Sequence, residues 1–317
     1  MVFEKSTRVG TQVHGFFLPL LEKKHLGHEV ALFNPIVFKA DFVSRMSSLK
    51  SKIKKGIKRT FRAWFAPKIG SSDFRRALDV LKVPKEKPVL VHSSLSAFGF
   101  VPGGPQTLLE SLQTYLQPDT TIVFPTHSWG LVSRGLRTFD ARSTPSCVGA
   151  VTEWFRQQPN VIRSLHPTHS VAALGPMAAA ITSRHEDSVT PCGLESPYER
   201  LLAMDATILF LGAPLTTNTS YHCCEGIVGV PYLLRDHLVD FELVDQEGGR
   251  IQKSMALHQA GVPRNLEPLN SMLKDQGVLN SVPLGHSAIQ SIRGLAFRKI
   301  LCDQLIANAN FLIQEVP

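Results

Sequence analysis

The chain has 317 residues, of which 43% are hydrophobic and 19% are charged. That length and balance are ordinary for a globular protein with one large core and argue against a disordered or fibrous chain. The formal net charge of +8 is unevenly distributed, because residues 1–70 hold 14 Lys and Arg against four Asp and Glu, whereas the rest of the chain holds 20 against 22. The basic character therefore belongs to the N-terminal segment.

A basic amphipathic helix is predicted over residues 47–66. Its apolar residues recur at helical spacing, with Lys and Arg between them: Leu49, Ile53, Ile57, Phe61 and Trp64. Such a helix can lie on an anionic membrane surface or bind a polyanion. Alternatively, it packs against the body of the protein and exposes its lysines to water. We predict a basic N-terminal extension over residues 1–70 and one folded domain over residues 71–317.

The remaining general features favour a cytoplasmic protein. The apolar run at residues 16–21 is far too short to span a bilayer, and the N-terminus lacks a signal-peptide pattern. The five cysteines form no CxxC pair, which is typical of a reducing compartment. We expect a cytoplasmic location, with the predicted helix able to bring the protein to a membrane surface.

From Ser71 onward, helical and strand patterns alternate along the chain. The predicted helices cover residues 71–82, 103–116, 148–158, 176–184, 196 onward, 263–276 and 295–309. The predicted strands cover residues 88–92, 120–125, 170–175, 206 onward and 288–293, with a hairpin formed by residues 241–244 and 250–255. This alternation predicts an α/β fold with a mixed, mostly parallel sheet and helices on both faces.

The most informative stretch is Ala206–Glu225, ATILFLGAPLTTNTSYHCCE. An apolar strand ends at Gly212, and a run of hydroxyl residues then precedes a helix, so His222 is expected in its first turn. Ligands bind at the carboxyl ends of strands in open α/β sheets, and a histidine there can accept a proton near neutral pH. Glu225 shares a helix face with His222 and could orient its ring. The alternative is a capped helix with a partly buried histidine.

Two further stretches are rich in polar side chains. VHSSL at residues 91–95 is followed by Gly103 and Gly104, and residues 163–170 form the sequence RSLHPTHS. Five histidines fall near predicted strand ends: His92, His127, His166, His169 and His222. A zinc site is therefore conceivable, although no HxH, HxxxH or HExxH pair lies on a predicted helix. The absence of GxSxG argues against a serine hydrolase.

Taken together, these blocks resemble the aminoglycoside 3-N-acetyltransferase family. The similarity is carried, in order, by VHSSLSAFGFVPGG, TIVFPTHS, RSLHPTHSVAALGP, SPYERLL, ILFLGAPLTTNTSYHCCE and GHSAIQSIRGLAF, which span residues 91–297. The resemblance implies an antibiotic-acetyltransferase fold distinct from the GNAT fold. It also implies acetyl transfer from acetyl-CoA, as co-substrate and without a metal, to a primary amine of an aminoglycoside or amino sugar.

The resemblance also implies roles for individual residues. His222 corresponds to the family's general base, with Glu225 as its support. The expected cofactor-binding positions are His92, Ser93, Ser94, Leu95, Gly104, Ser164, His166 and Ser170. Asp140, His258 and Thr219 are the expected substrate positions. Thr219 and Ser94 are also candidate donors to the oxyanion of the tetrahedral intermediate.

The loop expected to meet the acceptor is basic. Residues 130–142 contain Arg134, Arg137 and Arg142 against the single acid Asp140. Such a loop suits an amino sugar that carries a phosphate, nucleotide or carboxylate better than a polycationic aminoglycoside. Two other functions stay open from the sequence. One is a metal-dependent hydrolase built on the histidines, and the other is a non-catalytic protein that binds anionic surfaces through residues 1–70.

Overall fold

The computed structural model describes residues 66–313. The described residues all belong to one compact unit. The helix predicted over residues 47–66 lies outside the described residues except for Ala66, so its role and the boundary near residue 70 stay predictions. Ile69 is already buried in the core of this unit, and its backbone N–H donates to the Phe100 carbonyl at 3.0 Å.

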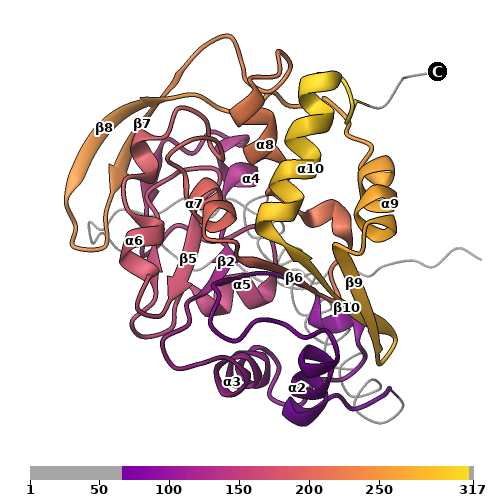
Figure 1. Cartoon of the computed structure of the whole chain (residues 1–317). Helices are drawn as coiled ribbons and strands as arrows, with labels where there is room; N and C mark the ends of the chain where they lie inside the picture. Colours follow the sequence, from indigo (N-terminus) through magenta and orange to yellow (C-terminus); the bar gives the residue numbers. More distant parts are fainter. Residues whose placement is uncertain (1–65, 314–317) are drawn as a thin grey trace, which may run out of the picture. The chain divides into compact units, whose positions relative to one another are not determined.

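A seven-stranded sheet forms the centre of this unit (Figure 1). The strands, in spatial order, are β4 (Ile162–Arg163), β5 (Val171–Leu174), β2 (Ile122–Pro125), β1 (Val89–Ser93), β6 (Thr207–Leu211), β10 (Ser287–Arg293) and β9 (Leu279–Leu284). β1 pairs in parallel with β2 and β6, whereas the other four pairings are antiparallel. The predicted mixed sheet is confirmed, and its parallel part consists of the three central strands.

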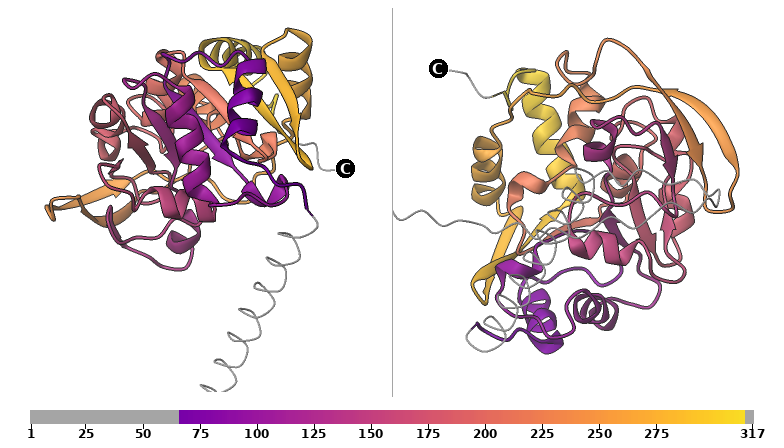
Figure 2. Two further views of the ribbon diagram at one scale, coloured as in Figure 1. Left: turned by 90° about the horizontal axis from the view of Figure 1, so that it is seen from below. Right: turned by 180° about the vertical axis from the view of Figure 1, so that it is seen from behind.

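Helices cover both faces of the sheet, as predicted (Figures 1 and 2). One face packs against α2 (Ser71–Val80), α3 (Pro105–Tyr115) and α5 (Ala150–Phe155). The other packs against α6 (Ala178–Thr182), α7 (Pro197–Ala203), α8 (Tyr221–Val228), α9 (Glu267–Asp275) and α10 (Gly294–Ala307). Alternation along the central strands explains both layers: Leu209 and Leu211 point to one face, and Ile208 and Phe210 to the other.

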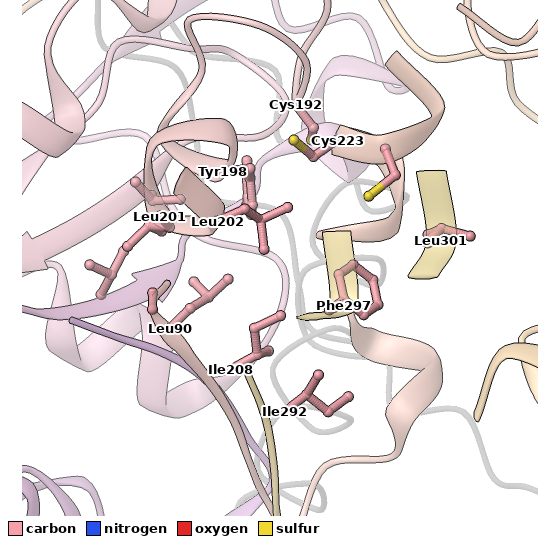
Figure 3. Close-up of a cluster of buried hydrophobic side chains, with 14 of the residues drawn as sticks. Leu90, Cys192, Tyr198, Leu201, Leu202, Ile208, Cys223, Ile292, Phe297 and Leu301 are labelled. Atoms are coloured by element: carbon pink, nitrogen blue, oxygen red, sulfur yellow. The ribbon is translucent and has the colours of Figure 1, made fainter. Parts of the chain in front are cut away.

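The larger core lies between the sheet and α7, α8 and α10 (Figure 3). There Leu90 of β1 and Ile208 of β6 lie in one cluster with Leu202 of α7 and Phe297 of α10, all essentially inaccessible to solvent. Burying a side chain of this size stabilises the fold by about 1.5–3 kcal/mol. This packing fixes the start of α8 relative to the ends of β1 and β6.

A smaller three-stranded sheet is formed by β3 (Thr138–Asp140), β7 (Val239–Val244) and β8 (Arg250–Met255), in that order. β7 and β8 form the predicted hairpin, which extends to one side in Figure 1. Phe139, Phe241 and Leu243 are buried in a separate small cluster. The loop that follows β2 is thereby tied to the hairpin through β3.

The element boundaries depart from prediction at two places near the C-terminus. The helix predicted from residue 263 begins only at Glu267, because the backbone before it forms an isolated bridge between Arg264 and Ile313. β9 was not predicted. It contains Pro283, which a sheet tolerates on an edge strand, and β9 is the edge of this sheet. Across residues 66–313, no helix is both long and apolar enough to cross a bilayer.

Candidate active site

Two cavities meet beside the first turn of α8. The larger has a volume of about 640 Å³ and lies at the carboxyl ends of β1, β2 and β6. The smaller has a volume of about 280 Å³ and lies against residues 257–260. The residues that line both cavities are Trp129, His169, Tyr221 and His222. Two reactants held in separate cavities could therefore meet at His222.

The chain between β6 and α8 places His222 at this junction. Gly212 follows β6 with a φ of 71°, and a Cβ there would lie 2.8 Å from the Ser94 carbonyl oxygen, so a larger residue would clash. The Asn218 side chain accepts the Ser220 N–H at 3.1 Å, which turns the backbone into α8. The predicted helix start after the hydroxyl run is confirmed. His222 is the second residue of α8.

Hydrogen bonds that link His222, Glu225 and Arg264 orient the His222 ring. Its Nδ1 lies 2.6 Å from Glu225 Oε2, and the Glu225 side chain is fully buried. Arg264 donates to the same carboxylate, from Nε to Oε1 at 3.1 Å and from Nη2 to Oε2 at 3.4 Å. A carboxylate can only accept, so Nδ1 carries the proton and the Nε2 lone pair is free. The predicted geometry of His222 and Glu225 on one helix face is present in the structure.

This environment favours a neutral His222 at physiological pH. Burial lowers the pKa of the ring, and its hydrogen bond to Glu225 acts in the opposite direction. Only 14% of the side chain is exposed, although it lines both cavities. A neutral imidazole with a free Nε2 can accept a proton, so the arrangement suits general base catalysis.

Other histidine rings pack around His222 in a continuous cluster. The centroid of the His258 ring lies 4.2 Å from the ring centroid of His222 and 4.6 Å from that of His169. The ring centroids of His127 and His169 are 4.8 Å apart. Burial is the main cause that lowers the pKa of His127 to about 3 and the pKa values of His169 and His258 well below 6.5. The cluster is therefore uncharged at neutral pH.

Comparison with known proteins identifies the family. The profile of the aminoglycoside 3-N-acetyltransferase family matches residues 90–299, which is more than half of the chain. The chain belongs to the aminoglycoside 3-N-acetyltransferase family.

Individual relatives agree with this assignment. The chain is 30% identical over 175 residues to the prophage-derived aminoglycoside N(3')-acetyltransferase-like protein YokD of Bacillus subtilis; the match covers 49% of this chain and 63% of that protein. The matched region thus spans less than two thirds of that relative's length. The crystal structure of aminoglycoside acetyltransferase AAC(3)-IVa, a histidine-to-alanine mutant in complex with a gentamicin, superposes with a TM-score of 0.67 at 26% identity, covering 78% of this chain and 92% of that one.

A second solved structure shows the shared fold only. AAC-IIIb in a binary complex with CoASH superposes with a TM-score of 0.66 at 19% identity, covering 79% of this chain and all of that chain. The predicted antibiotic-acetyltransferase fold is therefore confirmed. The positions that the family resemblance implies can now be located in the structure.

Two of the predicted cofactor positions line the larger cavity. These are His92, whose ring stacks on Phe210 with centroids 5.1 Å apart, and Ser93. His92 Nε2 and Ser93 Oγ are both buried and have no hydrogen-bond partner among the described residues. A bound ligand would supply such partners.

Three other predicted cofactor positions, Ser94, Leu95 and Gly104, do not line either cavity. The Ser94 N–H is already bonded to the Leu211 carbonyl at 2.9 Å, so only the Ser94 hydroxyl could serve as the predicted oxyanion donor. Leu95 opens a short 3₁₀-helix, and Gly104 precedes α3 with a φ of 59°. Their local role is to turn the chain after β1.

Apart from Thr168 and His169, which line the smaller cavity, the block at residues 163–170 is a buried support rather than a cavity wall. Arg163 donates from Nε to Ser170 Oγ at 3.1 Å and from Nη2 to the Thr126 carbonyl at 2.6 Å. Ser164 Oγ lies 2.8 Å from His185 Nδ1, whose ring packs 4.6 Å from His166. Ser164, His166 and Ser170 are buried and line neither cavity, and His166 Nδ1 accepts the His169 N–H, so the structure gives no support for direct cofactor contact by these three residues.

The predicted substrate positions separate in a similar way. Thr219 lines the larger cavity and His258 the smaller one. Asp140 lines neither, since its Oδ1 accepts the backbone N–H groups of Arg142 at 2.7 Å and Ser143 at 3.1 Å. Direct acceptor contact by Asp140 is not supported, because this carboxylate caps the turn after β3.

Four site residues were not predicted: His127, Trp129, Arg235 and Arg264. His127 stands in the TIVFPTHS block and lines the larger cavity, with Nε2 2.6 Å from the Tyr198 hydroxyl. That block was a usable signal for it. Arg264 lies 39 residues after Glu225, so its pairing with that acid depends on tertiary structure that no local pattern records.

The structure also brings together three groups that could bind a metal. A donor atom from each of His169, Cys192 and His258 lies within 4.8 Å of the other two. Burial raises the pKa of the Cys192 thiol well above its usual range, so the thiol is protonated at neutral pH. These residues come from three separate stretches, which explains why the sequence shows no metal-binding spacing.

Proposed function

We propose that this protein transfers the acetyl group of acetyl-CoA to a primary amine of an aminoglycoside or amino sugar, with His222 as the general base. The observation that carries the proposal is the position of His222 on the wall shared by the two cavities, with its Nδ1 held by the buried Glu225. The family assignment supports the reaction class, and gentamicin is the ligand named for one relative. Acetyl-CoA is proposed from the family's acetyl transfer and from the CoASH complex of a protein with this fold.

The larger cavity is the proposed donor site. The thioester arm of coenzyme A is uncharged, and the described residues that line this cavity include no Lys, Arg, Asp or Glu. His92 Nε2 and Ser93 Oγ provide hydrogen-bonding groups that lack partners among the described residues. The smaller cavity, with Arg235 and Arg264 on its wall, is the proposed acceptor site.

The transfer proceeds by addition and elimination at the thioester carbonyl. As the amine nitrogen bonds to that carbon, His222 Nε2 takes a proton from the nitrogen, and Glu225 stabilises the imidazolium through Nδ1. The carbonyl oxygen becomes an oxyanion and needs a donor, for which Thr219 is the proposed side chain on the larger cavity. The C–S bond then breaks, and the thiolate leaves and is protonated to free coenzyme A.

Thiol release tests this function. Purified protein is incubated with acetyl-CoA and a panel of aminoglycosides and amino sugars, and free thiol is followed with time. We expect release that depends on both an amine and His222. The matched control is His237→Ala, because His237 is exposed and lines neither cavity. Equal thiol release by His222→Ala and wild type would reject the general base.

A metal-dependent hydrolase is a second candidate, favoured by the His169, Cys192 and His258 donors. Metal binding there would need the buried thiol to lose its proton, which burial opposes. Elemental analysis of purified protein separates the two functions. Stoichiometric metal that is lost in Cys192→Ser, but retained in Cys223→Ser, would favour the hydrolase. Cys223 is an equally buried cysteine outside the donor cluster.

A further inference from the structure

The smaller cavity carries a charge pattern that identifies the class of acceptor. Arg235, Arg264, His258 and Gln259 lie on its wall, close to His222. Among the described residues that line either cavity, none is an aspartate or a glutamate. A binding site for several ammonium groups would be expected to present carboxylates.

The carboxylate of Glu225, which contacts His222, is already paired with Arg264. Glu225 is fully buried, lies 2.6 Å from His222 Nδ1 and accepts two hydrogen bonds from Arg264. Asp140, the acid of the loop after β2, is bonded to its own turn. Neither carboxylate lines either cavity, so neither is placed to receive a cationic acceptor there.

The Arg235 side chain, in contrast, has no carboxylate partner among the described residues. Its side chain makes one hydrogen bond among the described residues, from Nε to the His258 carbonyl at 3.4 Å, and it has no carboxylate partner within 4 Å there. Both terminal nitrogens thus lack a partner in the described part of the chain. A guanidinium in a cavity with two free N–H edges is suited to bind a phosphate or carboxylate.

His258 adds a second, independent sign of a ligand. Both of its ring nitrogens are buried and have no hydrogen-bond partner among the described residues, although the ring lines the smaller cavity. A buried group without a partner costs stability unless a ligand or water satisfies it. A neutral imidazole has one N–H that can donate to an anionic oxygen.

We propose that the acceptor is a small primary amine that carries an anionic oxygen group, and that Arg235 and His258 bind this group while the amine lies at His222 Nε2. The cavity volume of about 280 Å³ is at the lower end of the range for ligand pockets and suits one sugar ring rather than several. The inference rests on the proposed acetyl transfer. It adds that an amino sugar phosphate or an amino sugar carboxylate is preferred over a polycationic aminoglycoside.

Steady-state kinetics with full-length protein test this preference. The acceptors are glucosamine, glucosamine 1-phosphate, glucosamine 6-phosphate, muramic acid and gentamicin, with thiol release from acetyl-CoA as the readout. We expect kcat/KM for at least one anionic amino sugar to exceed that for glucosamine by about tenfold or more, mainly through KM. The phosphates and muramic acid distinguish phosphate from carboxylate recognition.

Variants at position 235 identify the group responsible. Arg235→Gln should reduce the preference for the anionic sugar over glucosamine about tenfold, and Arg235→Lys should restore part of it, since it keeps the charge but not the paired N–H groups. Arg235→Glu should shift the preference towards gentamicin. The matched control Arg76→Gln, at an exposed arginine of α2 that lines neither cavity, should keep the preference of wild type.

The outcomes separate this inference from the proposed function. If gentamicin is acetylated with a higher kcat/KM than every anionic sugar, in a His222-dependent reaction, acetyl transfer stands and the anionic acceptor is rejected. An Arg235→Gln variant that lowers kcat/KM equally for glucosamine and for the anionic sugars also rejects it. If no amine, gentamicin included, gives His222-dependent thiol release, then the proposed function itself fails.

Discussion

Two histidine-containing stretches of this chain have similar composition but different surroundings. In α8, His222 contacts the side chain of Glu225, which also pairs with Arg264, and His222 lines two cavities. In the stretch at residues 163–170, Ser164 and His166 bond only within the fold, near the buried Arg163. The comparison shows that a dense set of polar residues marks a reactive site only where a cavity reaches it and a charge supports it.

The buried stretch still contributes to the site indirectly. Arg163 connects β4 to residues 126 and 128 of the loop after β2, through the Thr126 carbonyl at 2.6 Å and Ser128 Oγ at 3.1 Å. That loop carries His127 and Trp129 to the cavities. The guanidinium carbon of Arg163 also lies 4.8 Å from the centroid of the Phe139 ring, which belongs to the small sheet. The support therefore fixes the wall opposite α8.

The largest difference between the two stretches is expected in catalytic rate. His222→Ala should lower kcat about 10²–10⁴-fold, because the amine loses its proton acceptor. The free energy of unfolding should change by less than about 1 kcal/mol, since the ring is at a cavity edge. Single-turnover thiol release and urea denaturation measure the two quantities. A variant with near wild-type kcat would show that α8 is also only a support.

In the buried stretch, the largest effect should be on stability. Arg163→Met should lower the free energy of unfolding by about 3 kcal/mol, because it leaves the Thr144 carbonyl oxygen buried without a donor and takes from the Thr126 carbonyl one of its two side-chain donors. The kcat of the folded fraction should stay within about threefold of wild type, as expected for a residue away from the reacting groups. Urea denaturation checks the first result. A large fall in kcat at unchanged stability would instead assign Arg163 to the reaction.

Glu225 and Asp140 are the two acids predicted at the site, and substituting them should change kcat to different extents, by less than the loss of His222 does. Glu225→Gln should lower kcat about tenfold, because the amide can still accept from Nδ1 but no longer stabilises the imidazolium. It should also lower the pKa of His222 further, since Glu225 raises it in the native protein. Asp140→Asn is the matched control and should leave kcat within about twofold of wild type. Equal losses in both variants would return Asp140 to the site.

Local sequence patterns predicted most of this architecture. The apolar run of β6 and the turn at Gly212 placed α8 and, with it, the shared face of His222 and Glu225. Helix-face spacing is a local property, so it can be derived from residue numbers alone. The predicted hairpin over β7 and β8 is confirmed for the same reason.

Contacts between distant segments could not be predicted in this way. Arg264 reaches Glu225 from a different element, and the cavities depend on how three loops pack. Ser164, His166 and Ser170 resembled cofactor positions by type, but their burial follows from β4 and β5 pairing at one end of the sheet. Local patterns thus identified the polar residues, whereas tertiary packing determined which of them line a cavity.

The last expected effect is on acid stability and comes from His185, which packs against His166 and Ser164 of the buried stretch. Burial lowers the pKa of His185 to about 3, whereas an unfolded histidine has a pKa of about 6.5. Between these values the unfolded chain binds a proton that the folded protein does not. The contribution of His185 is therefore fully present above about pH 6.5 and is lost by about 1.4 kcal/mol for each unit that the pH falls.

His185→Gln removes this single titration, so the slope of unfolding free energy against pH should decrease by about 1.4 kcal/mol per unit below about pH 6. The glutamine loses the bonds to Ser164 and the Pro191 carbonyl in part, which lowers stability at all pH values but does not change the slope. Urea denaturation at several pH values gives both quantities. An unchanged slope would mean that His185 is protonated in the native protein. It would reject the description of the residues around Arg163 as a buried support in which His185 is neutral.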